Sequence, residues 1–194
     1  MQTQPGIWDP LIRLFHWSVA VGFLLNFTLF EEGESLHEWI GYYILAALLV
    51  RFCWGFIGPE NARFRDFFPR KTTLKAHVDE LARGEITEHN GHTPLGGLMI
   101  IALMSSLLLV GFTGWLTTTD MFWGESWLEE IHEFFANATL FLVCIHVAAV
   151  VFFSVLGPNN LIRQMWTGRR SEKNEKNLGK GGTNSAKETH TFNH

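Results

Sequence analysis

The sequence has few cysteines and no basic residue near its start. Only two cysteines occur in 194 residues, and each stands alone in an apolar segment, so the chain offers neither a disulfide framework nor a CxxC redox pair. Cys53 and Cys144 are expected to act as small hydrophobic residues. No lysine or arginine precedes Arg13, so the basic region of a secretory signal peptide is missing, and we expect the first apolar segment to remain as an anchor.

Charged residues are also missing from long parts of the chain. Residues 95–117 contain none, although 18% of all residues are charged and 47% are hydrophobic. This distribution is too apolar and too uneven for an ordinary soluble domain. It predicts a membrane protein.

Four segments have the roughly 20 residues that a helix needs to cross a hydrocarbon core of about 30 Å. They lie at about 10–30, 36–57, 95–117 and 128–156. The sequence therefore predicts an all-α fold, an integral membrane four-helix bundle formed by residues 1–170. Residues 171–194 are rich in Lys, Asn, Gly and Glu, and we expect them to form a disordered cytoplasmic tail.

Basic residues are concentrated on one side of these spans. The connections at 31–35 and 118–127 contain no lysine or arginine, whereas the segment between the second and third spans contains six: Arg63, Arg65, Arg70, Lys71, Lys75 and Arg83. Because basic loops stay in the cytoplasm, both termini and this segment are predicted to be cytoplasmic. Within it, Leu74, Val78 and Leu81 recur at helical spacing, which indicates a short amphipathic helix on the membrane surface.

Four of the nine histidines fall within or at the ends of apolar spans: His16, His37, His132 and His146. An ionisable residue in a membrane span is costly and usually functional. For His37 and His132 alone, an interfacial polar role is an equal alternative. The other five are expected to be solvated in the cytoplasmic loop and tail, although an HxxH metal fragment at His89 and His92 is an alternative: His77, His89, His92, His190 and His194.

The predicted topology sorts the four span histidines by depth. His37 and His132 each lie at the outer end of an inward-running helix, whereas His16 lies near the cytoplasmic face. His146 is about 21 Å along the helix from His132 and about 40° away in rotation, on nearly the same face. Depth therefore predicts two pairs, His16 with His146 and His37 with His132, each joining two helices.

Two imidazoles facing each other across a bundle core are suited to bind haem iron from both sides. The sequence has no CxxCH motif, so the predicted haem is non-covalent and of b type. We expect two haem b groups with His16, His37, His132 and His146 as axial ligands. A histidine-lined transporter or metal carrier without haem is the alternative, whereas a quinone-linked thiol oxidase would need paired cysteines.

Arg51 is a cation inside the second span, and it is suited to pair with a haem propionate. Extension of its side chain to the membrane surface is the alternative. Glycines 22, 41, 55, 111 and 114 could let a flat macrocycle approach the backbone, and close helix packing explains them equally well.

Several short motifs occur in a specific order over about residues 7–170: Trp8-Asp9-Pro10, Arg13, His16-Trp17, His37-Glu38-Trp39-Ile40-Gly41, Arg51, Trp54-Gly55, His92-Thr93-Pro94-Leu95-Gly96, Gly111-Phe112-Thr113-Gly114, His132-Glu133 and His146. In this set the chain resembles the prokaryotic cytochrome b561 and Ni/Fe-hydrogenase cytochrome b group.

This resemblance implies a four-helix, usually di-haem protein of the bacterial inner membrane that relays electrons between quinone and a redox partner. It implies the same four histidines as ligands and a supporting role for Arg51. The expected partners are membrane lipid, a quinone or quinol, and an outer-side redox protein such as a c-type cytochrome or a hydrogenase-like subunit; nucleic acid is not expected. The chain would then be an electron-transfer protein, in some members the membrane subunit of a quinone-linked oxidoreductase.

Overall fold

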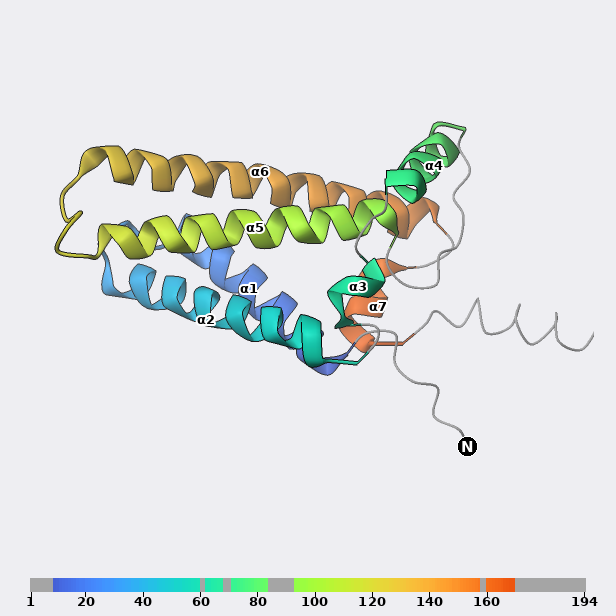
Figure 1. The fold of residues 1–194 in the computed structure, drawn as a ribbon, viewed down its shortest axis with the longest axis horizontal. Coiled ribbons are helices and arrows are strands. Elements are labelled where there is room, and N and C mark those ends of the chain that lie inside the picture. The colour runs from blue at the N-terminus through green and yellow to red at the C-terminus, as the bar shows by residue number, and fades with distance from the viewer. Residues whose placement is uncertain (1–8, 60–61, 68–70, 84–92, 158–159, 170–194) are drawn as a thin grey trace, which may run out of the picture.

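The computed structural model describes residues 9–59, 62–67, 71–83, 93–157 and 160–169. Every regular element in these ranges is a helix (Figure 1). In chain order they are α1 (Pro10–Thr28), α2 (Ser35–Ile57), α3 (Phe64–Phe67), α4 (Lys71–Ala82), α5 (Pro94–Thr117), α6 (Ser126–Leu156) and α7 (Leu161–Thr167). The tail predicted to be disordered, residues 171–194, lies outside the described residues, as do His89, His92, His190 and His194.

The four predicted spans are confirmed as α1, α2, α5 and α6, each long and apolar enough to cross a membrane. The largest differences from the predicted bounds are at the end of α1, which stops at Thr28, and at the start of α6, which begins at Ser126. These helices bury few residues against one another. Phe52, Phe141 and Val155 are all more than half exposed, as expected for side chains that face lipid.

The first and third spans begin with the same capping chemistry. The Asp9 carboxylate accepts a hydrogen bond from the Leu11 amide at 2.8 Å, and the Thr93 hydroxyl accepts one from the Gly96 amide at 3.1 Å. A proline follows each cap at the first helical position, where its missing N–H costs nothing. These local signals fix where α1 and α5 enter the bundle.

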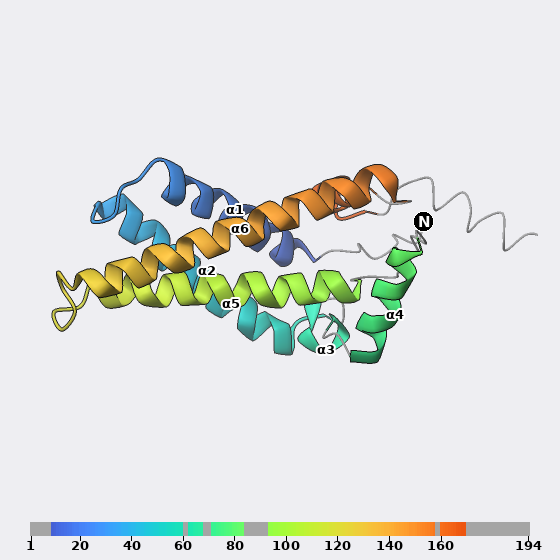
Figure 2. The same ribbon diagram turned by 90° about the horizontal axis from the view of Figure 1, so that it is seen from above.

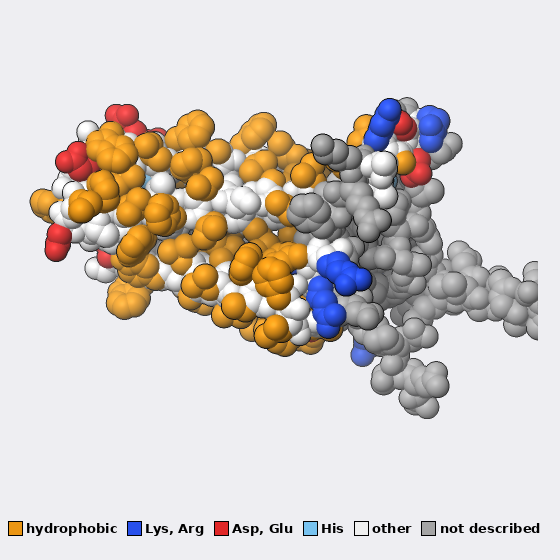
Figure 3. All heavy atoms as spheres, viewed as in Figure 1, with side chains coloured by type: hydrophobic (Ala, Val, Ile, Leu, Met, Phe, Trp, Pro, Cys, Tyr) orange, Lys and Arg blue, Asp and Glu red, His pale blue; other side chains and the backbone are white. Residues whose placement is uncertain are grey.

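The helices form an elongated bundle in which α5 lies beside α6 and α2, and α2 lies beside α1. The α1–α2 and α5–α6 connections lie at one end, and α3, α4 and α7 lie at the other (Figures 1 and 2). The first end carries Asp and Glu side chains without Lys or Arg in this view, and the second end carries Lys and Arg together with a few acidic side chains of α4, with an apolar surface between the two ends (Figure 3). We call these the acidic end and the basic end.

The centre of the bundle is a small apolar core. Val19 and Phe23 of α1 pack with Ile44 and Leu48 of α2, and all four are buried. On α6, Thr139 is fully buried, and its hydroxyl donates to the Phe135 carbonyl of its own helix at 2.8 Å. The core therefore separates the two ends of the bundle, where the conspicuous polar side chains lie.

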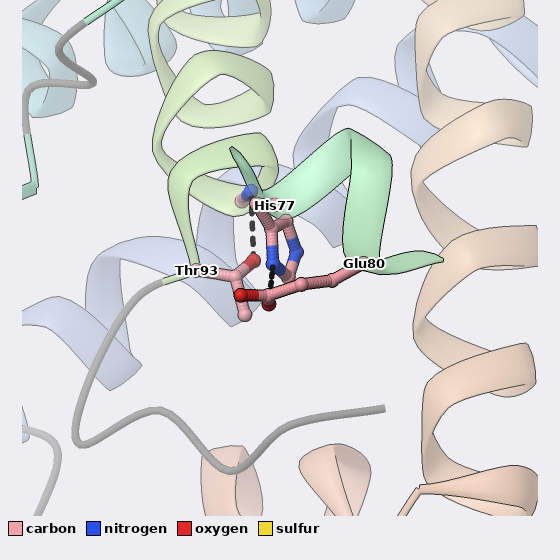
Figure 4. A network of polar contacts seen from close by, with 4 residues as sticks. His77, Glu80 and Thr93 are labelled. Atoms are coloured by element: carbon pink, nitrogen blue, oxygen red, sulfur yellow. Dashed lines mark hydrogen bonds and ion pairs between the residues drawn. The ribbon is translucent and has the colours of Figure 1, made fainter. Parts of the chain in front are cut away.

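The short helix predicted around Leu74, Val78 and Leu81 is confirmed as α4, whereas its position on the membrane surface stays a prediction, and the expectation for His77 is wrong. His77 is 5% exposed rather than solvated. Its Nδ1 lies 3.8 Å from a carboxylate oxygen of Glu80, and both residues lie beside Thr93 at the start of α5 (Figure 4). The burial arises because α4 packs on α5, a contact between segments that a periodicity argument cannot supply.

Two short helices, α3 and α7, were not predicted. The Asn160 side chain caps α7 by accepting from the Arg163 amide at 2.8 Å, and Gly168 ends it with a φ of 73°, which favours glycine. Arg13 of α1 donates to the carbonyls of Met165 (3.1 Å) and Trp166 at the end of α7. These bonds fasten α7 against the first turn of α1.

Candidate functional site

The four span histidines lie in two pairs in the structure. The ring centroids of His16 (α1) and His146 (α6) are 6.3 Å apart, and those of His37 (α2) and His132 (α6) are 6.2 Å apart. Each pair joins two different helices. We call His16 and His146 the basic-end pair and His37 and His132 the acidic-end pair. These are the partners that depth predicted; ligation of iron stays a prediction.

The separation within each pair suits a metal held between two imidazoles. Imidazole nitrogen binds metals such as zinc at about 2.0–2.1 Å. Two such bonds would take up about 4.2 Å of the 6.2 Å between the ring centroids of the acidic-end pair. The remaining 2.0 Å is about the sum of the distances from each bonding nitrogen to the centre of its own ring. The centroid separations of both pairs are therefore compatible with one metal ion bound between two imidazoles.

The hydrogen bonds of His132 determine which of its nitrogens is available. Its Nδ1 lies 3.1 Å from the Val110 carbonyl oxygen and 3.1 Å from the Thr113 hydroxyl. Because a carbonyl can only accept, Nδ1 must carry the proton, and Nε2 then has the free lone pair that a metal needs. Such a bond from the second ring nitrogen is the usual support of a metal-binding histidine. His132 itself is 8% exposed.

His37 is held in a similar way. Its Nδ1 lies 3.4 Å from the Phe30 carbonyl, which selects the same proton position. In addition, the side-chain amide of Asn26 on α1 donates to the His37 carbonyl at 3.1 Å. The first turn of α2 is thus tied to α1 through the His37 backbone and to the α1–α2 connection through the His37 side chain.

A cavity of about 780 Å³ lies beside the acidic-end pair. His37 and His132 line it together with Asn26, Tyr42, Gly111 and Gly114. Its volume is within the range of small-molecule and cofactor sites, about 300–1,000 Å³. Glu32, Glu38 and Glu129 also line this cavity, so it opens among the carboxylates of the acidic end.

Gly114 makes the position of the His132 ring possible. A Cβ at residue 114 would lie 2.8 Å from Cε1 and 3.2 Å from Nδ1 of that ring. Real side chains do not approach this closely, so only glycine allows the imidazole to lie against α5. This close approach gives Gly114 a specific role, which the sequence pattern alone left equal to general helix packing.

The basic-end pair has different surroundings. The His16 ring makes an edge contact with Trp17 at 5.1 Å, and Trp17 contacts Trp166 of α7 at 5.4 Å. The buried Nδ1 of His16 finds no hydrogen-bond partner among the described residues. His16 and His132 therefore differ in how firmly their second ring nitrogens are held.

Arg51 lies in α2 and is 4% exposed. Its guanidinium carbon is 5.0 Å from the centre of the Phe64 ring of α3, a cation–π contact. The side chain is therefore covered by α3 rather than extended into water at the membrane surface. A positive charge is held at the basic end of the bundle.

Other metal-binding arrangements are weaker in this structure. Within the described ranges, no three His, Cys, Asp or Glu side chains come together in a way that could hold a metal ion. Zinc sites use three or four protein ligands, whereas haem supplies four nitrogens itself and needs only axial ligands from the protein. The paired histidines thus fit haem better than a bare ion. Cys53 and Cys144 are free and exposed on the helix surfaces.

Sequence reasoning missed two supporting residues, Thr113 and Asn26. Thr113 contacts a histidine 19 positions later in the chain, and Asn26 bonds the backbone of a residue 11 positions later. The one sequence signal for these residues is a polar side chain within an apolar span. This signal is not specific, because a hydroxyl in a span can simply bond a carbonyl of its own helix. Only the packing of helices identifies their partners.

Comparison with known proteins gives a family match over most of the chain. The family model for prokaryotic cytochrome b561 matches residues 7–168, a range that includes both histidine pairs and Arg51. No curated protein and no solved structure matches the chain.

Proposed function

The chain belongs to the prokaryotic cytochrome b561 family, and from this premise we propose that it is a membrane cytochrome that relays electrons through two bis-histidine haem b groups. His16 with His146 and His37 with His132 would supply the axial ligands. The observation that carries the proposal is the spacing of both pairs, 6.3 Å between the ring centroids of His16 and His146 and 6.2 Å between those of His37 and His132.

Bound haem would supply reversible one-electron chemistry. The chain's own residues would hold each group, orient it and set its surroundings. The Val110 carbonyl accepts from Nδ1 of His132, which leaves the lone pair of Nε2 available to bind iron. Gly114 supplies the room for the ring, and Asn26 fixes the start of the helix that carries His37.

Arg51 would serve the basic-end site. A haem propionate can supply two hydrogen-bond acceptors to a guanidinium group. Its cation–π contact with Phe64 keeps the guanidinium within the protein. We therefore assign Arg51 a supporting role in cofactor binding rather than a role in iron ligation.

The charge distribution supports an orientation. Six basic residues lie between the second and third spans and none lies in the connections at 31–35 and 118–127. By the positive-inside rule, the basic end would face the cytoplasm of a bacterial inner membrane, with both termini on that side. The acidic end would then meet an outer-side redox protein, such as a c-type cytochrome or a hydrogenase-like subunit, and quinone in the membrane would be the other reactant.

An optical spectrum of the purified protein tests this proposal. The reduced-minus-oxidised difference should contain a b-type α-band, and extraction with acidic organic solvent should release the haem because no thioether bond holds it. The haem content should be two per chain. Absence of an α-band from protein produced with ample haem would refute the proposal and favour a transporter or metal carrier.

A further inference from the structure

We propose that the acidic-end site has the lower reduction potential of the two, and that Thr113 is a positioning residue that helps to lower it. This inference rests on the proposed function and adds the direction in which electrons move. It starts from the hydrogen bonds that hold the second ring nitrogens of His37 and His132 but not that of His16, and from the carboxylates that line the acidic-end cavity.

Thr113 is the residue that distinguishes the acidic-end pair most clearly. It is 6% exposed, and its hydroxyl lies 2.9 Å from the Leu109 carbonyl, 3.1 Å from the Val110 carbonyl and 3.1 Å from His132 Nδ1. The hydroxyl has one proton, which it donates to a carbonyl of its own helix. Its lone pairs then face the His132 Nδ1–H, so this N–H is shared between the Val110 and Thr113 oxygens.

Such sharing changes the electron donation of the ring. An imidazole that gives its Nδ1 proton to strong acceptors becomes a more basic ligand through Nε2. A more basic ligand stabilises ferric iron, which carries one more positive charge than ferrous iron, and so lowers the reduction potential. His37 receives the same kind of support from the Phe30 carbonyl at 3.4 Å, whereas the buried His16 Nδ1 has no acceptor within the described part of the chain.

Charge acts in the same direction. Glu32, Glu38 and Glu129 line the cavity that contains His37 and His132. Negative charges near iron favour the ferric state, and Coulomb interactions of this kind are strengthened where water is partly excluded. At the other end of the bundle, Arg51 places a buried positive charge, which favours the ferrous state. An electron that reaches the acidic-end site would therefore move downhill toward His16 and His146.

Potentiometric titration of the purified, haem-loaded protein tests the order of potentials. The wild-type α-band should titrate in two one-electron steps. Thr113→Val removes the hydroxyl acceptor at nearly constant side-chain volume, so the lower of the two reduction potentials should rise. The expected rise is up to ~59 mV, which is a tenfold change in the ferric-to-ferrous equilibrium, and the higher potential should not change. Thr113→Ser retains the hydroxyl and should titrate as the wild type does.

Thr139→Val is the matched control, because Thr139 is buried on the helix that carries His132, and within the described ranges its hydroxyl bonds only the Phe135 carbonyl of that helix. It should leave both steps unchanged. If Thr113→Val loses the acidic-end haem, Thr113→Ala removes the same acceptor without the bulk of valine, and its titration decides. The inference is overturned if the upper step moves instead, if neither moves, or if Thr139→Val produces the same shift. Two haems of equal potential overturn the inference alone, whereas a wild-type protein without haem overturns the proposed function with it.

Discussion

Replacement of Gly114 by alanine offers a sharp test of the acidic-end site. The new Cβ would lie 2.8 Å from Cε1 of His132, whereas ordinary contact begins at 3.4 Å, so the imidazole must retreat by about 0.6 Å. A retreat along the line from Nδ1 to the Val110 oxygen would lengthen that 3.1 Å hydrogen bond to about 3.7 Å, beyond hydrogen-bonding range. Loss of this support is expected to weaken haem binding about 10- to 100-fold.

Gly114→Ala is expected to weaken haem binding, whereas by helix propensity alone it should stabilise the protein. Alanine is favoured over glycine inside a helix by about 0.8–1.0 kcal/mol, so Gly114→Ala strengthens α5 while it disturbs the site. A fall in haem content could not then be attributed to a weaker helix. Gly22→Ala is the matched control, because a Cβ at residue 22 would meet its nearest neighbour, Ile40, at an ordinary 3.5 Å.

The assay is haem content per purified chain, together with the spectrum of the haem that remains. Gly114→Ala should lower the content from two haems toward one and leave the remaining haem low-spin, since His16 and His146 are untouched. Gly22→Ala should retain two. Two haems with an unchanged spectrum in Gly114→Ala would refute the placement of the His132 ring against α5.

Three further predictions follow from the same contacts. His146→Ala should remove one haem and leave the other, whereas His77→Ala, at a buried histidine outside both pairs, should retain two; loss of haem from the His77 variant would count against the pairing. Arg51→Gln should lower the upper reduction step because a buried positive charge is lost, and Arg51→Lys should restore much of it; an unchanged potential in Arg51→Gln would exclude a role near the basic-end haem. Arg13→Gln removes the guanidinium that donates to the Met165 and Trp166 carbonyls. The free energy of opening α7, measured by amide hydrogen exchange, should fall by at most about 1.5–3 kcal/mol, and unchanged protection would show that Arg13 does not hold α7.

The four long helices could be predicted from the sequence because hydropathy and length suffice for a membrane span. The caps at Asp9 and Thr93 are local as well, since each bonds an amide two or three residues later. Depth also indicated which histidines face one another, because the rise per residue of a helix is fixed. These features depend only on a single segment or on its position along the membrane normal.

The features that sequence could not supply depend on contacts between helices. The burial of His77 requires α4 to pack on α5, and the cover over Arg51 requires the short helix α3. Helix α7 has only seven residues, too few for a periodic pattern, and its ends at Asn160 and Gly168 are identified by the structure. The bond from Thr113 to His132 depends on the rotation of α5 against α6, which composition does not determine.

The central claim, two haems each held by one histidine pair, is tested most directly by the haem content of double variants. If His16 and His146 share one haem, the double variant His16→Ala/His146→Ala should retain one haem per chain, as each single variant does. The cross-pair variant His132→Ala/His146→Ala should retain none. Loss of both haems from the first, or retention of a haem by the second, would contradict the account.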